Sequence, residues 1–128
     1  MNRKEFYEAK LKYETDSWDL FEALNNDDVV AIDARSEEAF GIEHIPTAIN
    51  IPHRTMSETN TRQFDKSKVY VTYCDGIGCN ASTKGALNMA SLGFEVKELL
   101  GGLDWWKRDG YSTEGSAGRE GRKVVCGC

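Results

Sequence analysis

A strand-type run, a glycine-rich turn and a helix-type run follow one another in residues 69–92, and this order constrains the fold most. Residues 69–73 (VYVTY) are β-branched or aromatic, which predicts a strand. Two glycines interrupt the chain next, and residues 81–92 have the composition of a helix that ends at Gly93. Cys74 lies between strand and helix, where the amide groups of a tight turn and the helix start favour a thiolate. Nucleophilic chemistry at the Cys74 sulfur is the leading hypothesis.

Strand-type and helix-type segments alternate along most of the chain. We predict helices near residues 3–14, 17–24 (with Ser17 as N-cap) and 36–40, and strands at 29–33, 49–51, 69–73 and 96–100. This alternation indicates an α/β fold with a central parallel sheet that helices cover on both faces. Functional groups of such sheets gather beyond the carboxyl ends of strands, where Asp33 and Cys74 both fall.

The 128 residues are enough for one domain with a single core. We divide the chain into an N-terminal helix (residues 1–16), the domain proper (17–111) and a flexible tail (112–128). Glycines interrupt the polar tail, which ends in Cys126-Gly-Cys128.

Charge and composition exclude several partners. The formal net charge is −5 and no basic stripe occurs, which argues against a nucleic-acid partner. The charged N-terminus does not resemble a secretory signal, and no apolar run is long enough to span a membrane. We therefore expect a cytoplasmic protein without a membrane partner. In that reducing compartment the four cysteines are more readily catalytic, redox-active or metal-binding than structural bridges.

Four segments together resemble the rhodanese family of sulfurtransferases. They occur in the family's order: VAIDARSEEAF (residues 30–40), EHIPTAINIP (43–52), the cysteine loop with its helix (73–94) and GGLDW (101–105). The second segment is similar to the family's Gly-His-Ile-Pro-Gly-Ala-x-Asn-Ile-Pro stretch. The resemblance covers residues 17–111 and implies the three-layer rhodanese-like fold, with a central parallel sheet flanked by helices.

The chain departs from the family pattern at its cysteine loop. The usual loop is Cys, four residues and then Arg-Ser, whereas here six residues separate Cys74 from Ala81 and no arginine follows until Arg108. Phosphate and arsenate chemistry need a bidentate arginine, so the composition favours sulfur chemistry. The loop resembles a subgroup that reads Cys-x-Gly-x-Gly-Cys-Asn. Glu43 and Thr47 also stand where the family usually has glycine.

The resemblance implies a single-domain thiosulfate sulfurtransferase-like enzyme, with Cys74 as the catalytic nucleophile. Its thiolate takes the outer sulfur of a thiosulfate-type donor, forms a persulfide and passes that sulfur to a thiol, cyanide or a protein acceptor. No cofactor and no metal are implied. The backbone N–H groups of the substrate-binding loop would hold the anionic sulfur; that loop consists of Asp75, Gly76, Ile77, Gly78, Cys79 and Asn80.

Two charged residues are candidates for supporting roles. Asp33 either orients the active loop or forms a plain ion pair with Arg35. Lys84 either contributes a point charge or is a solvated surface lysine. Trp105 and Trp106 face differently on a helix, so we expect one in the core and the other at the mouth of the site.

The remaining cysteines are candidate resolving thiols. Cys79 follows Cys74 by five residues and either approaches it to disulfide distance or is only a loop residue. Cys126 and Cys128 either accept sulfur from Cys74, form a metal site with the loop cysteines, or are inert. The alternative function is therefore a redox switch or non-catalytic interaction module that uses a Cys74–Cys79 disulfide.

Overall fold

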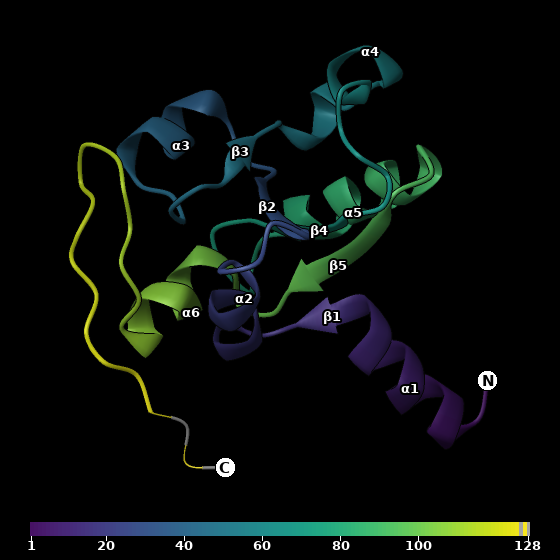
Figure 1. Cartoon of the computed structure of the whole chain (residues 1–128), viewed down its shortest axis with the longest axis horizontal. Helices are drawn as coiled ribbons and strands as arrows, with labels where there is room; N and C mark the ends of the chain where they lie inside the picture. Colours follow the sequence, from purple (N-terminus) through teal and green to yellow (C-terminus); the bar gives the residue numbers. More distant parts are fainter. Residues whose placement is uncertain (126, 128) are drawn as a thin grey trace.

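A single sheet of five parallel strands, in the spatial order β1-β5-β4-β2-β3, forms the centre of the molecule (Figure 1). The computed structural model describes residues 1–125 and 127, so the predictions for Cys126 and Cys128 lie outside the described residues. The strands are β1 (Glu14–Thr15), β2 (Val29–Asp33), β3 (Ile49–Asn50), β4 (Val69–Tyr73) and β5 (Glu95–Leu99). The predicted parallel α/β sheet is confirmed, and β1 is an addition that we did not predict.

Helix α1 (Arg3–Tyr13) confirms the predicted N-terminal helix. Its N-cap is Asn2, whose side chain accepts a hydrogen bond of 2.9 Å from the Glu5 amide. None of its residues is buried, and the helix extends away from the sheet (Figure 1). The chain then forms β1, which pairs with β5 at the sheet edge.

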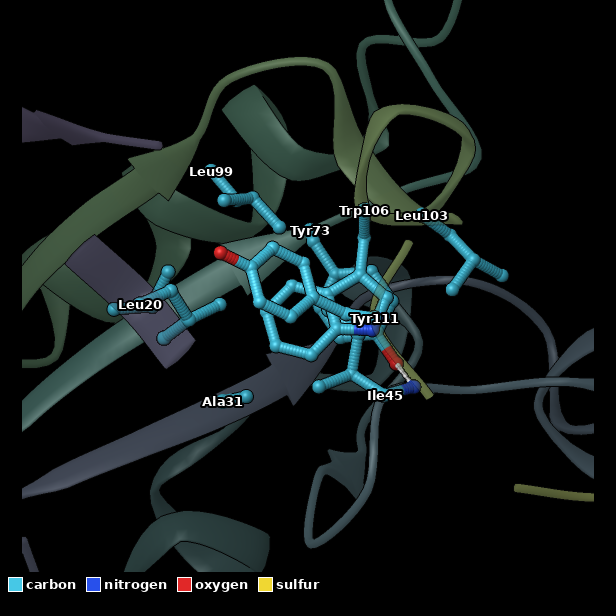
Figure 2. Close-up of a cluster of buried hydrophobic side chains, with 9 residues drawn as sticks. Leu20, Ala31, Ile45, Tyr73, Leu99, Leu103, Trp106 and Tyr111 are labelled. Carbon is cyan, nitrogen blue, oxygen red and sulfur yellow. Dashed lines mark hydrogen bonds between the residues drawn. The ribbon is translucent and has the colours of Figure 1, made fainter. Parts of the chain in front are cut away.

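The side chains of the strands alternate between two cores, one on each face of the sheet. The first core lies under α2 (Ser17–Ala23) and α6 (Gly102–Asp109) (Figure 2); it contains Leu20, Ala31, Ile45, Val71, Tyr73, Leu99, Leu103, Trp106 and Tyr111. The second lies under α5 (Ala81–Ser91); it contains Ile32, Ile51, Tyr70, Met89 and Phe94. The helices on one face, the sheet, and the helix on the other face make the predicted three layers.

Three short helical elements connect the strands: α3 (Glu37–Ile42), η1 (His53–Thr55) and α4 (Glu58–Thr61). The predicted N-cap of α2 was wrong by one residue. Asp16 is the cap, because its carboxylate accepts a 2.8 Å hydrogen bond from the Asp19 amide, while Ser17 is already helical. No helix in the described part of the chain is long and apolar enough to cross a membrane.

The turn before β3 contains Thr47, one of the two positions where the chain departs from the family pattern. The Ala48 amide donates to the Ile45 carbonyl at 3.1 Å, so residues 45–48 form a β-turn with Pro46 at its second position. Thr47 takes φ of 72°, in the left-handed region that favours glycine. The turn required by the sequence motif is therefore made, but with a β-branched residue where glycine would fit better.

The first part of the predicted tail is bonded to the domain. His44 and Glu114 exchange two backbone hydrogen bonds of 2.9 Å, and the amides of Ser116 and Ala117 donate to carbonyls of α3 at 3.1 and 2.8 Å. Thr113 is buried with 5% exposure. Residues 113–117 thus lie against the end of α3, while the flexibility of the tail stays a prediction.

Candidate active site

Cys74 directly follows β4, at the carboxyl end of the strand that lies between β5 and β2. It is 2% exposed. Its carbonyl accepts a 2.9 Å hydrogen bond from the Leu103 amide, and the Asp75 carbonyl accepts one of 2.7 Å from the Asp104 amide. The start of α6 therefore fixes the position of Cys74 and of the first loop residue.

Gly102 makes this close approach possible. Its φ is 58°, and a Cβ there would collide with the Cys74 carbonyl oxygen and approach the Gly76 amide nitrogen to 3.0 Å. The Gly-Gly pair of the family motif thus has a local cause here, because only glycine lets α6 start against the cysteine loop.

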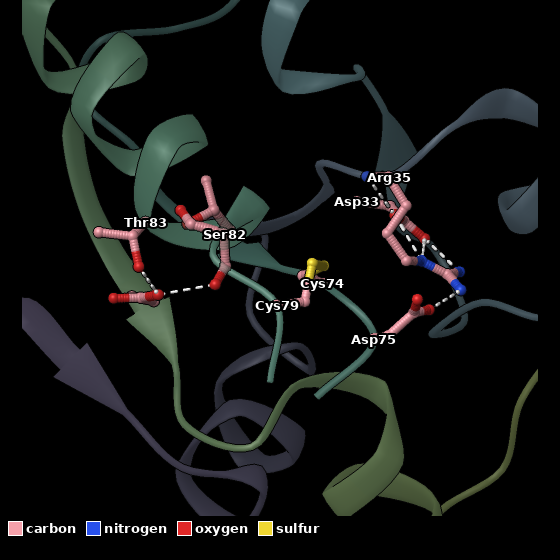
Figure 3. Close-up of a disulfide and its surroundings, with 9 residues drawn as sticks. Asp33, Arg35, Cys74, Asp75, Cys79, Ser82 and Thr83 are labelled. Carbon is pink, nitrogen blue, oxygen red and sulfur yellow. Dashed lines mark hydrogen bonds and ion pairs between the residues drawn. A yellow bond between two sulfur atoms is a disulfide. The ribbon is translucent and has the colours of Figure 1, made fainter. Parts of the chain in front are cut away.

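A disulfide joins Cys74 to Cys79 across the loop, with 6.3 Å between their Cα atoms (Figure 3). The Cys79 amide donates to the Gly76 carbonyl at 3.2 Å, which closes a tight turn within the loop. Cys79 is half-buried, and Ile77 is 76% exposed. Of the two alternatives for Cys79, the structure shows approach to disulfide distance of Cys74, and its role as a resolving thiol stays a prediction.

The rest of the loop leaves backbone donors available. Within the described part of the chain, the amides of Gly76, Ile77 and Gly78 donate to no other protein group. Asn80 is the N-cap of α5, and its side chain makes no capping hydrogen bond. Amides of this kind are suitable donors to an anion bound beside the loop.

Arg35 links the end of β2 to the loop (Figure 3). Its guanidinium donates to both carboxylate oxygens of Asp33, at 2.8 Å from Nη2 to Oδ2 and 3.0 Å from Nε to Oδ1, and reaches Asp75 at 2.9 Å. Burial alone would lower the pKa of Arg35, but hydrogen bonds and charges from Asp33 and Asp75 outweigh it and raise the pKa. Asp33 is fully buried and forms an ion pair with Arg35, and Arg35 forms a second ion pair with Asp75. The ion pair of Asp33 with Arg35 is confirmed, and the role of Asp33 in orienting the loop stays a prediction.

Two cavities flank the disulfide. The larger, of about 720 Å³, is lined by Arg35, the loop from Asp75 to Cys79, Trp105 and Lys107, among others. The smaller, of about 300 Å³, is lined by Arg35, His53, Arg54, Cys74 and Cys79, among others. Cys79 lines both cavities, whereas Cys74 lines only the smaller one. Another cavity, of about 850 Å³, lies between α1, α2 and the sheet and includes neither cysteine.

Two arginines line the smaller cavity, and one of them, Arg35, is paired with Asp33 and Asp75. Burial lowers the pKa of His53, and the nearby charges of Arg54 and Lys84 lower it further. Lys84 itself is exposed and lines neither cavity beside the cysteines. Arg54 is also exposed, and Asp75 is the acidic residue that lines the same cavity. Arg54 is therefore the cation at this opening that has no acidic partner among the described residues, and its charge can attract a small anion despite the negative net charge.

The helix that follows the loop is fastened to β5. The hydroxyls of Ser82 and Thr83 both donate to one carboxylate oxygen of Glu98 at 2.6 Å, and Thr72 donates to the Ser82 carbonyl at 2.9 Å (Figure 3). These bonds fix the start of α5, and therefore the far end of the cysteine loop, relative to the sheet.

The two tryptophans divide as expected. Trp106 is 1% exposed and belongs to the first core, whereas Trp105 is 43% exposed and lines the larger cavity. In the described residues no group of three or more His, Cys, Asp or Glu side chains is arranged to hold a metal ion.

Several residues of the site were not identified from the sequence. Arg35 was considered only as a partner of Asp33, yet it binds Asp75, 40 positions away. Arg54 comes from the helical turn after β3, and its position beside Cys74 depends on how distant segments pack. No local pattern signals such a contact, although a search for basic residues after each strand would have found it.

The chain matches the family described as Rhodanese-like domain over residues 17–109, and it belongs to that family. It is 31% identical over 94 residues to the thiosulfate sulfurtransferase GlpE of Coxiella burnetii, an alignment that covers 72% of this chain and 81% of the relative. It is also 31% identical over 78 residues to the adenylyltransferase and sulfurtransferase uba4 of Ogataea parapolymorpha, covering 60% of this chain and 20% of that relative.

Solved structures agree with this assignment. The crystal structure of the BH2092 protein from Bacillus halodurans superposes with a TM-score of 0.87 at 42% identity, covering 90% of this chain and 85% of that chain. The predicted rhodanese-like α/β fold is confirmed. The family and its relatives support sulfurtransferase activity in general.

Proposed function

We propose that this protein transfers sulfane sulfur from a small thiosulfate-type anion to a thiol or cyanide acceptor through a persulfide on Cys74. The observation that carries the proposal is the position of Cys74, which lies at the carboxyl end of β4 and lines a cavity together with Arg35, His53 and Arg54. A sulfur whose cavity is also lined by the Arg54 cation suits attack on the outer sulfur of a dianion.

The cysteine loop supports the second requirement, which is to hold a persulfide anion. The amides of Gly76, Ile77 and Gly78 have no partner among the described protein groups and belong to residues that line the larger cavity, so we propose that they donate to the outer sulfur once the Cys74–Cys79 bond is open. Asp33 acts as a positioning residue through Arg35 and Asp75. Lys84 adds positive charge at the rim rather than a contact to the donor. We propose that the protein belongs to the subgroup with a Cys-x-Gly-x-Gly-Cys-Asn loop, because residues 74–80 read CDGIGCN.

The test is thiocyanate formation from thiosulfate and cyanide by reduced protein that carries Cys79→Ser, in which no Cys74–Cys79 bond can form in competition with the acceptor. Cys74→Ser should lower the rate by more than about a thousandfold, because serine forms no persulfide. Gly41→Ala is the matched control, since a Cβ at this position on α3 meets nothing within 4 Å. Equal rates with and without Cys74→Ser in this background would contradict the proposal.

The disulfide favours a second candidate, in which the protein is a redox switch or interaction module. In the bonded form Cys74 offers no thiolate to a donor, so oxidation would switch the site off. Peptide mapping of reduced protein under mild oxidant separates the two functions. A Cys74–Cys79 bridge that forms much faster than any persulfide favours the switch, and the reverse order favours sulfur transfer.

The remaining expectations belong to this proposal. We expect a reducing, cytoplasmic environment, because the catalytic form requires the cysteines as thiols. A protein is a further candidate sulfur acceptor. We also propose a sulfur relay from Cys74 to Cys126 and Cys128, because the tail has enough residues to extend to the cysteine loop. Replacing both tail cysteines with serine and finding unchanged turnover with every thiol and protein acceptor would contradict the relay.

A further inference from the structure

We propose that Cys79 resolves the Cys74 persulfide and releases its sulfur as hydrogen sulfide, so that the protein reduces the sulfane sulfur of its donor with electrons from a dithiol. The inference rests on the proposed function, since it needs the persulfide. It assigns to Cys79 a chemical step that a loop residue or a simple oxidation switch would not perform.

The contact between the two sulfur atoms carries the argument. The structure joins Cys74 Sγ to Cys79 Sγ while the loop keeps its own turn, the 3.2 Å bond from the Cys79 amide to the Gly76 carbonyl. The anchors at the other end are also intact, from Leu103 to the Cys74 carbonyl and from Asp104 to the Asp75 carbonyl. Cys79 therefore reaches Cys74 Sγ without unfolding the site.

Burial determines which sulfur each reactant meets. Cys74 is 2% exposed, whereas Cys79 is half-buried and lines both cavities. With the bond to Cys79 formed, Cys74 Sγ leaves an external thiol little access, whereas Cys79 Sγ is in contact with that atom. Such preorganisation gives the internal thiol a large kinetic advantage over one that must diffuse in.

The first two steps balance as follows. The Cys74 thiolate attacks the outer sulfur of thiosulfate, the sulfur–sulfur bond of the donor breaks, and sulfite leaves. The Cys79 thiolate then attacks Cys74 Sγ, the bond from Sγ to the outer sulfur breaks, and that sulfur leaves as hydrosulfide, which takes up the proton lost by the Cys79 thiol. The two cysteines are oxidised to a disulfide while the sulfane sulfur is reduced to sulfide.

The third step restores the thiols. One thiolate of an external dithiol attacks the more accessible Cys79 Sγ, and the Cys74 thiolate leaves. The second thiol of the reductant then breaks the mixed disulfide. The net reaction converts thiosulfate and a dithiol into sulfite, hydrogen sulfide and the oxidised dithiol. The disulfide in the structure is thus the state at the end of the second step.

The experiment is a single turnover without any reductant. Protein is reduced, freed of reductant under anaerobic conditions and mixed with one equivalent of thiosulfate; sulfite, sulfide and the intact mass are then measured. The unmodified protein should release sulfite and sulfide in equal amounts and lose the mass of two hydrogens. Cys79→Ser should release sulfite alone and keep the mass of one added sulfur, and Cys79→Ala should behave in the same way.

The outcomes separate the two proposals. Sulfite without sulfide from the unmodified protein contradicts the Cys79 step but leaves sulfur transfer intact. Sulfide from Cys79→Ser, or a peptide map that joins Cys74 to Cys126 or Cys128, also contradicts it. Absence of sulfite from all three proteins overturns the proposed function and this inference together.

Discussion

Thr47 is the one non-glycine residue with positive φ in the described part of the chain. It takes φ of 72° at the third position of the 45–48 turn. The left-handed conformation costs a non-glycine residue about 1 to 2 kcal/mol. Glycine removes this cost, but it also increases the conformational entropy of the unfolded chain, which offsets part of the gain in stability. Thr47→Gly should therefore raise the free energy of unfolding by about 0.5 to 1 kcal/mol. Urea titration measures the change.

Thr47→Ala is the control for that prediction. Alanine keeps the Cβ that disfavours the left-handed region, so it should recover less of the stability than glycine. A loss of stability in Thr47→Gly would show that the threonine side chain contributes more than its backbone conformation costs.

At the scale of elements, α6 positions the cysteine loop through the close approach at Gly102. A Cβ at this position would collide with the Cys74 carbonyl and disfavour φ of 58°. Gly102→Ala should lower the free energy of unfolding by at least about 2 kcal/mol and reduce sulfur transfer in the protein that still folds. Thermal unfolding and thiocyanate formation measure the two effects.

Gly41→Ala is the control for this element, because alanine is the better helix former and meets nothing within 4 Å on α3. It should leave activity unchanged. An equal effect of the two substitutions would contradict the role of Gly102.

The end of α3 and the segment after α6 are joined by the buried carboxylate of Glu43. It accepts hydrogen bonds from Lys107 at 2.8 Å and Thr113 at 2.6 Å, and Arg119 lies at 3.4 Å. Burial alone would raise the pKa of Glu43, but these bonds and charges outweigh it and lower the pKa. Glu43→Gln should cost about 1 to 3 kcal/mol of unfolding free energy at neutral pH.

The pH dependence of that loss has a definite sign. A lowered pKa gives stability that is present above the ordinary glutamate pKa and is lost as pH falls through the lowered value. The difference between the unmodified protein and Glu43→Gln should therefore shrink below about pH 4, as measured by urea unfolding across the acid range. Glu114→Gln, at a 62% exposed side chain, should change stability little at any pH. A constant difference for Glu43→Gln would contradict the ion-pair account.

For the whole molecule, local sequence patterns predicted most helices and strands, whereas strand β1 and the long-range contacts depend on tertiary packing. β2 and β4 were predictable because each is a short run of apolar and β-branched residues, and Cys74 because it directly follows such a run. β1 was not, since two residues carry no periodicity and form a strand only by pairing with β5. The bond from Thr113 to Glu43 spans 70 positions, and no pattern within either segment signals it.

The site divides in the same way. The loop and its two cysteines are visible in the sequence, because glycines and cysteines have strong local meanings there. The cavity beside Cys74 is not, because Arg35 and Arg54 come to it from segments that follow other strands. The order of the strands within the sheet was not predicted, because neither local composition nor the order of the family segments specifies which strands pair.

The most direct test of the central claim is the mass of the Cys74 peptide in reduced Cys79→Ser after incubation with thiosulfate. This variant lacks the thiol that we propose removes the persulfide, so the added sulfur should remain in place. The account predicts a gain of one sulfur mass on Cys74, with one equivalent of sulfite released, and no gain when Cys74→Ser is added to the variant. An unmodified Cys74 peptide, with no sulfite released, would contradict sulfur transfer through this residue.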